Sequence, residues 1–174
     1  MQTALVCIEF QNEFITEGGK LHDAVKGVME STEMLSKSVA LAEAVRAAGG
    51  KVMHVPIMFK EDASDNPNKK LGILAGCAEG KLFTEGTWNS EFCKEMTPKD
   101  GDVVVTGKKG LDAFPNTTLE AELRKMGQML SNALEAQAHL EGRLLQMASS
   151  SAVPPDDPRS AAEAQVVELD EGLQ

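Results

Sequence analysis

Basic residues are scarce in this chain of 174 residues, which has 17 Lys and Arg against 27 Asp and Glu and a formal net charge of −10. This acidity argues against nucleic acid or an anionic membrane surface as a partner, because either needs clustered Lys and Arg. No stretch approaches the roughly 18 apolar residues of a membrane span. No basic segment precedes the first apolar run, as it would in a signal peptide. We therefore predict a cytoplasmic protein with no nucleic-acid and no membrane partner.

Cysteine is also rare. Cys7, Cys77 and Cys93 form an odd set without a CxxC motif or a histidine at metal-ligand spacing. This usage favours a reducing compartment and indicates neither a structural metal nor a cofactor. The remaining composition is ordinary, with 42% hydrophobic and 25% charged residues. It fits one globular domain with a core of its own.

The residues present are organised around TALVCIEFQNEF, residues 3 to 14. This nearly unbroken apolar run predicts a buried central strand of a parallel sheet with helices on both faces. Glu9 is the exception within it. A carboxylate near the carboxyl end of such a strand lies where open α/β sheets place ligands and catalytic groups, and its burial requires a partner.

A helix followed by a second strand comes next. Apolar spacing predicts a helix from Val28 to Ala48, ended by Gly49 and Gly50, and KVMHVPIMF predicts a strand over residues 51 to 59. Strand, helix and strand together indicate a right-handed crossover with parallel strands. His54 lies within the apolar run, and we interpret it as a structural histidine because no second ligand stands at metal spacing.

A third short strand is predicted from Asp102 to Thr106, and Lys108 follows it closely. Lys108 therefore lies, like Glu9, just beyond the carboxyl end of a strand. Such a pair can activate a nucleophile, or it can be a solvated ion pair at the edge of a sheet. The residues alone leave both interpretations open. Thr117 and Glu120 have the spacing of a capping box and predict the start of a helix.

Several blocks of the chain resemble, in order, the isochorismatase-like cysteine hydrolase family. They are ALVCIEFQNEF, AVRAAGGKVMHVPIMF, LGILAGCAEGKLFTEGTWNSEFC and the most specific, VVVTGKKGLDAFPNTTLEAELRKMG. The resemblance covers about residues 3 to 127. It implies a Rossmann-like parallel sheet flanked by helices, often in oligomers, and hydrolysis of C–N or ether-type bonds in small molecules. Zinc, which nicotinamidase relatives use, is not indicated, because no Asp-x-His…His arrangement occurs.

The resemblance also implies a catalytic triad of aspartate, lysine and cysteine. Glu9 stands at the position of the aspartate and Lys108 at that of the lysine. In such a triad the carboxylate takes the thiol proton, the lysine favours thiolate, and backbone amides stabilise the oxyanion. Glu9 departs from the usual aspartate by one methylene, which moves the carboxylate by roughly 1.5 Å at most.

A larger departure follows Gly127, because no cysteine occurs after Cys93. From residue 129 onward the chain has no Lys, Ile, Phe, Trp or Tyr, and eight acids face two arginines. We predict an incomplete isochorismatase-like domain over 1–127, an amphipathic helix over 128–148 and a flexible acidic tail over 149–174. The resemblance implies that Leu5 to Phe10 would be an interior strand whose second neighbours come from the missing part, so without them this strand is expected to be an edge. The chain is then expected to be oligomeric or prone to aggregation.

The sequence thus predicts a hydrolase of a small amide or related substrate by lineage, defective as written because the nucleophilic cysteine is absent. None of the three cysteines present stands at a predicted helix start, so none is expected to replace it. The alternative is a non-catalytic interaction protein, a half-domain that pairs with a complete relative in a homo- or hetero-oligomer. A third interpretation is an alternative splice or a mis-joined gene after Gly127.

Overall fold

The computed structural model describes residues 3–150, without the side chains of 130, 145 and 148–150. The chain divides into two units after Met129. Among the described residues, no helix is both long and apolar enough to cross a membrane.

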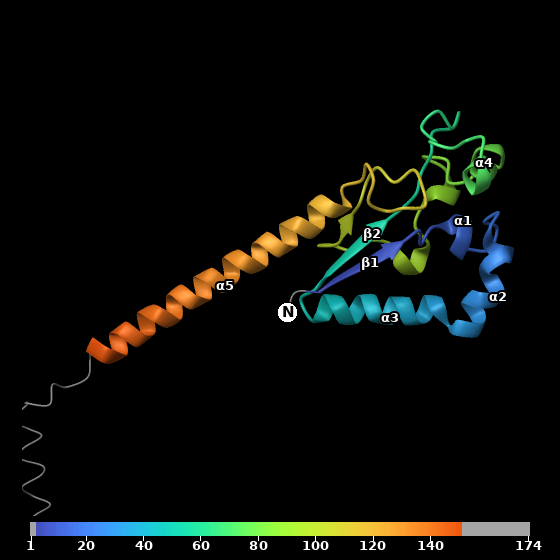
Figure 1. Ribbon diagram of the computed structural model, residues 1–174. Helices are drawn as coiled ribbons and strands as arrows, with labels where there is room; N and C mark the ends of the chain where they lie inside the picture. The colour runs from blue at the N-terminus through green and yellow to red at the C-terminus, as the bar shows by residue number, and fades with distance from the viewer. Residues whose placement is uncertain (1–2, 151–174) are drawn as a thin grey trace, which may run out of the picture. The chain divides into compact units, whose positions relative to one another are not determined.

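The first unit is built on a parallel sheet of three strands in the order β1-β2-β3 (Figure 1). They are β1 (Ala4–Ile8), β2 (Lys51–Val55) and β3 (Val103–Val104). Ala4 pairs with Lys51 and Ile8 with Val55 along β1 and β2, whereas β3 pairs only through Met53 and His54 of β2. The predicted parallel α/β fold is confirmed. All three strands are shorter than the apolar runs that predicted them, since β1 ends at Ile8, β2 at Val55 and β3 at Val104.

Helices cover both faces of this sheet. On one face α3 (Met34–Ala47) packs on the strands, and its Ala42 is buried with Cys7 and Val52. On the other face the first turns of α5 (Leu119–Ser150) bring Leu119 against Met53 and Val55. Since neighbouring residues of β2 point to opposite faces, its continuous apolar run supplies both cores.

The helix predicted over residues 28 to 48 is wrong as a single element. The structure has α2 (His22–Thr32) and α3, separated by Glu33 in the left-handed conformation with φ 54°. Apolar spacing does not reveal such a break, because one left-handed residue redirects the chain without altering the hydrophobic pattern.

Shorter elements complete the first unit at the carboxyl end of the sheet. They are α1 (Asn12–Ile15), α4 (Gly72–Glu79) and the 3₁₀ turns η1 (Trp88–Ser90) and η2 (Lys94–Met96). A third apolar cluster joins α4 to the chain after β2 through Ile57, Phe59, Leu74, Cys77, Leu82 and Phe83. These elements form the surroundings of the strand tips.

The predicted capping box at the start of α5 does not form. The Thr117 hydroxyl accepts the backbone N–H of Leu119 at 3.3 Å and donates to the carbonyl of Ala113 at 2.6 Å, while Glu120 pairs with Arg124. The helix also continues through Gly127, where the sequence pattern changes, up to Ser150. Of the predicted tail 149–174, residues 149 and 150 belong to α5 and the rest lies outside the described residues.

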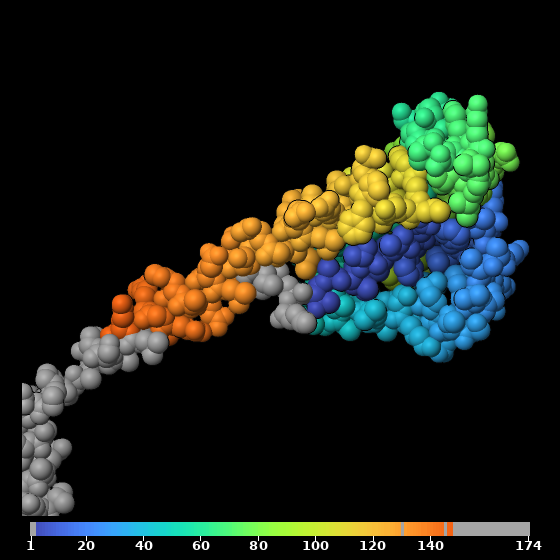
Figure 2. Space-filling model, viewed as in Figure 1, coloured from blue at the N-terminus to red at the C-terminus, as the bar shows by residue number. Residues whose placement is uncertain are grey.

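β1 is an edge strand among the described residues, as expected if its second neighbour is missing. Its last side chain, Ile8, is 47% exposed. The dark-blue atoms of this region are visible at the surface in Figure 2. The prediction of a buried central strand over residues 3 to 14 is therefore wrong for β1, and the central strand is β2, whose Val52, Met53 and Val55 are buried.

Candidate functional site at the strand tips

Glu9 is the first residue after β1, and its backbone is left-handed with φ 60°. Its N–H still donates to the carbonyl of Val55 at 3.0 Å, and its carbonyl accepts the N–H of Gln11 at 2.8 Å. A side chain in this conformation costs about 1–2 kcal/mol. These two backbone bonds hold Glu9 in the left-handed conformation. This conformation ends the strand and interrupts the alternation of side chains along it.

Lys108 reaches the same place from the turn after β3. Gly107 before it has φ 95°, and a Cβ there would lie 2.3 Å from the carbonyl oxygen of Asn116, so only glycine fits. The Lys108 side chain is fully buried. A buried ammonium group requires hydrogen-bonding partners and an opposite charge.

The structure brings the two predicted site residues together. Lys108 Nζ donates to Glu9 Oε1 and to the carbonyl oxygen of Gly110. The Glu9 side chain remains 22% exposed, whereas the Lys108 side chain is fully buried, so only the Glu9 side of the pair is reachable from solvent. An accessible base held beside a buried cation can accept a proton from a reacting group, provided a nucleophile stands next to it.

Lys109, the next residue, belongs to a different contact. Its Nζ lies 2.6 Å from Asp65 Oδ2 and donates to the carbonyl oxygen of Met58 at 2.5 Å. It ties the loop before α4 to the segment that follows β2. Only the first lysine of the pair therefore faces Glu9.

Two polar residues of the site were missed in the sequence. Gln11 is fully buried, and its amide donates to the carbonyls of Ile57 and Ser90 and accepts the N–H of Ile57, at 2.7–2.9 Å. Glu13 is also fully buried. Its carboxylate accepts N–H groups from Lys20 at 2.6 Å, Asn89 at 2.8 Å and Phe83 at 3.3 Å.

These two side chains fasten the segments after β2 and around η1 to the end of β1. The sequence signal that could have identified Gln11 and Glu13 is their position directly after an apolar strand. A polar side chain that follows a buried strand without a turn residue must find hydrogen bonds inside the fold.

The three cysteines are all free and buried. Burial raises the pKa of the Cys7, Cys77 and Cys93 thiols above their ordinary value. At Cys77 in α4, the charges of Glu9 and Glu13 raise the pKa further and that of Lys108 opposes them. A nucleophilic cysteine requires the opposite, a lowered pKa and access to substrate.

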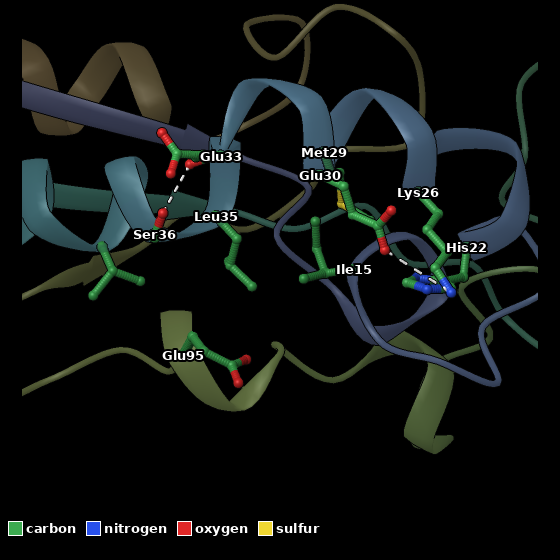
Figure 3. Close-up of a pocket in the computed structure, with 10 residues that line it drawn as sticks. Ile15, His22, Lys26, Met29, Glu30, Glu33, Leu35, Ser36 and Glu95 are labelled. Atoms are coloured by element: carbon green, nitrogen blue, oxygen red, sulfur yellow. Dashed lines mark hydrogen bonds and ion pairs between the residues drawn. The ribbon is translucent and has the colours of Figure 1, made fainter.

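Glu9 is one of the residues that line a hollow of about 280 Å³. Its other lining residues are apolar, namely Ile8, Phe10, Phe14, Ile15, Val25, Met29 and Met34. A larger apolar groove of about 600 Å³ lies between α2, α3 and η2 (Figure 3). Its charged residues include Lys26 and Glu30, 4.0 Å apart on the surface of α2. The smaller hollow is the candidate site because it alone of the two contains a member of the ion pair.

His54 belongs to a buried ion-pair cluster behind the sheet, as its interpretation as a structural residue implied. Its Nε2 lies 3.1 Å from Asp102 Oδ2, and Arg46 donates to both oxygens of Asp102 at 3.0 and 2.6 Å. Burial lowers the pKa of His54, and the contact with Asp102 opposes this only in part. Among residues 3–150, no group of three or more His, Cys, Asp or Glu side chains could hold a metal ion.

Fold and site together define a class: a parallel α/β domain with an acid–lysine pair at the carboxyl ends of its strands. Residues 3–129 match the isochorismatase domain family, so the chain belongs to that family.

The relatives it resembles are hydrolases. The ureidoacrylate amidohydrolase RutB of Pantoea ananatis is 29% identical over 142 residues, which cover 72% of this chain and 54% of the relative. An isochorismatase family protein from Desulfovibrio vulgaris has 29% identity and a TM-score of 0.59, covering 71% of this chain and 61% of the other. N-carbamoylsarcosine amidase from Thermoplasma acidophilum has 26% identity and a TM-score of 0.56, covering 73% and 63%. The chain thus spans about half the length of the curated relatives it matches.

Proposed function

We propose that this chain carries part of an isochorismatase-type hydrolase site for a small amide or related substrate, and that it is catalytically defective by itself. The observation that carries the proposal is the Glu9–Lys108 pair, with a fully buried lysine and a partly exposed glutamate that lines an apolar hollow. In this site Glu9 is the base and Lys108 the cation that favours thiolate. The substrate class follows from the amide-hydrolysing names of two relatives.

The missing part of the chemistry is the nucleophile. A thiolate must attack the amide carbon while its proton passes to Glu9, and donors must stabilise the oxyanion that forms. The sequence has no cysteine after Cys93, and each of the three present is buried with a raised pKa. Glu9 and Lys108 therefore lack a group to activate. The three free thiols also support the proposal of a cytoplasmic setting.

An ammonia-release assay tests this proposal. Small ureido, carbamoyl and simple amides are incubated with the wild-type chain, Lys108→Met and Lys109→Met. Lys109→Met is the matched control because it removes a neighbouring lysine that pairs with Asp65 instead of Glu9. We expect all three proteins to release ammonia at the background rate. Turnover by wild type and Lys109→Met that is lost in Lys108→Met would show that the chain is a competent enzyme.

A second candidate function is a non-catalytic interaction half-domain, favoured by the edge position of β1. An edge strand presents unpaired backbone N–H and C=O groups that can pair with another chain. Co-purification of this chain with a longer hydrolase from its natural source supports this function. An intact mass from that source that exceeds 18.6 kDa, with a cysteine-bearing segment following Gly127, supports hydrolysis instead.

A further inference from the structure

Nine positions of α5 form an uninterrupted seven-residue repeat that is almost wholly apolar, although Met129, Leu134 and Leu145 lie off it. Starting at Leu119, steps of four and three residues alternate without interruption to Met147. The nine positions are Leu119, Leu123, Met126, Leu130, Ala133, Gln137, Leu140, Leu144 and Met147. We call this set the seam. Eight of its nine residues are apolar, and all seven charged residues of 119–147 lie off it.

A repeat of this kind is typical of helices that coil around one another. A straight helix drifts about 20° per heptad from a period of 3.5, so four heptads would carry the stripe about 80° around the helix. A helix that only covers a sheet has no reason to keep the repeat. The repeat runs over about four heptads, of which residues 130–147 make up about two and a half, and it is typical of a helix with a coiled-coil partner.

The two ends of the seam have different surroundings. Leu119, Leu123 and Met126 pack in the core on the β2 face of the first unit. Farther along, Leu140 is 57% exposed and Leu144 is 65% exposed. The part of the seam from residue 130 to residue 147 covers about 27 Å of helix. It is the part that a partner helix would cover.

From these observations we infer that residues 130–147 form a parallel, in-register coiled coil with a second copy of this chain. Gln137 identifies the partner. It occupies the same type of seam position as Leu130 and Leu144, and in a parallel pair it meets the Gln137 of the other copy. A primary amide both donates and accepts, so two such amides satisfy each other.

Other arrangements leave the Gln137 amide against an apolar side chain, which costs a buried hydrogen bond. In an antiparallel pair centred on the same segment, Gln137 would face Leu140. The amide already donates to Glu141 at 2.9 Å along its own helix, which leaves its second N–H and its oxygen for the other copy. Charge does not oppose the pairing, since residues 129–147 hold only Glu135, Glu141 and Arg143.

Sedimentation of the full chain over a range of concentrations tests this dimer. The wild type is expected at twice the chain mass of 18.6 kDa. Leu140→Glu places a charge in the seam and should raise the dimer dissociation constant at least about tenfold. Ala138→Glu adds the same charge to the outer face of the same helix and should change it less than about twofold. Equal helicity of both variants by circular dichroism is the control for folding.

Orientation is tested by oxidation of Gln137→Cys, with Ser131→Cys as the off-seam control. A parallel pair predicts a disulfide-linked dimer from Gln137→Cys only, since the native cysteines are buried. Three results would overturn the inference. They are a chain that stays monomeric at about 100 µM, a dimer indifferent to Leu140→Glu, and a Leu140-dependent dimer in which Gln137→Cys does not cross-link.

Discussion

Lys108 is the residue whose removal should affect the first unit most directly. Lys108→Met keeps a long side chain in the cavity but leaves the Glu9 carboxylate and the Gly110 carbonyl without their cation. Because Glu9 is partly hydrated, we expect a loss of about 1–3 kcal/mol in the free energy of unfolding. Lys109→Met, with both partners partly exposed, should lose less than about 1 kcal/mol.

Urea titration of Lys108→Met, Glu9→Gln and the double variant Glu9→Gln/Lys108→Met measures the coupling free energy between the two side chains. The double variant removes both charges, so it should recover part of the loss. If the double variant is as unstable as the sum of Glu9→Gln and Lys108→Met, the two side chains are not coupled.

Asp102 makes stability depend on acid pH. Its contacts with Arg46, the backbone N–H of Lys99 and His54 outweigh its burial and lower its pKa to about 2. A carboxylate with a lowered folded pKa contributes stability above its unfolded pKa, roughly 3.9, and loses it as the pH falls toward 2. We expect Asp102→Asn to lower the free energy of unfolding at neutral pH by about 2 kcal/mol. Between pH 4 and pH 2 the free energy of unfolding of this variant should change less with pH than that of the wild type. The exposed Asp23→Asn is the control and should keep the wild-type pH dependence.

His54 acts in a separate pH window. Because burial lowers its folded pKa, its contribution is present above the unfolded value of about 6.5 and declines as the pH falls from there. Unfolding free energies measured from pH 7 to pH 2 should therefore show two regions of loss. An Asp102→Asn curve with the same slope as wild type below pH 4 contradicts the assignment of that region to Asp102.

At the scale of elements, the junction of α2 and α3 is the place where one residue carries backbone strain. Glu33 has φ 54°, and its side chain makes only an exposed ion pair with Lys37 at 3.2 Å. Glu33→Gly relieves the left-handed conformation and should raise the free energy of unfolding by about 0.5–1 kcal/mol.

Glu30→Gly is the matched control for this junction, because residue 30 lies within α2. There the same substitution should lower the free energy of unfolding by up to about 1 kcal/mol. Thermal unfolding followed by circular dichroism compares the two. Equal destabilisation by both variants would mean that α2 and α3 form one helix in solution, as the apolar spacing first indicated.

For the whole molecule, we expect the open edge of β1 to be the main site of nonspecific aggregation. Ile8→Lys places a charge beside the unpaired edge, and charged side chains block edge-to-edge pairing. We expect slower growth of light scattering on mild heating than for wild type. Val28→Lys changes an equally apolar residue, 67% exposed on α2, and should leave the rate unchanged.

This association is distinct from the dimer proposed for α5. If Ile8→Lys and Val28→Lys slow aggregation equally, the effect is one of net charge and the edge is not the contact. If Ile8→Lys abolishes the concentration-dependent dimer, association through β1 replaces the seam as its explanation.

The sequence by itself determined the fold class and predicted that Glu9 and Lys108 would meet. Apolar runs separated by a helix of period 3.6 require a parallel sheet with covered faces, and parallel strands bring their carboxyl ends to one edge. Glu9 and Lys108 each follow such a strand, so their meeting is a consequence of topology. The family blocks through Gly127 agree with the same arrangement.

Only the tertiary structure decided where the strands end and what surrounds the pair. The left-handed residues Glu9 and Glu33 leave the hydrophobic pattern unchanged. Gln11 and Glu13 acquire their roles from backbone and side-chain groups 46–79 residues away in the sequence and from the backbone of Lys20. The burial of all three thiols depends on packing between distant segments. The spacing of residues along the chain determines which face of a helix or strand each side chain occupies. Its desolvation and its hydrogen-bond partners depend on which other segments pack against that face.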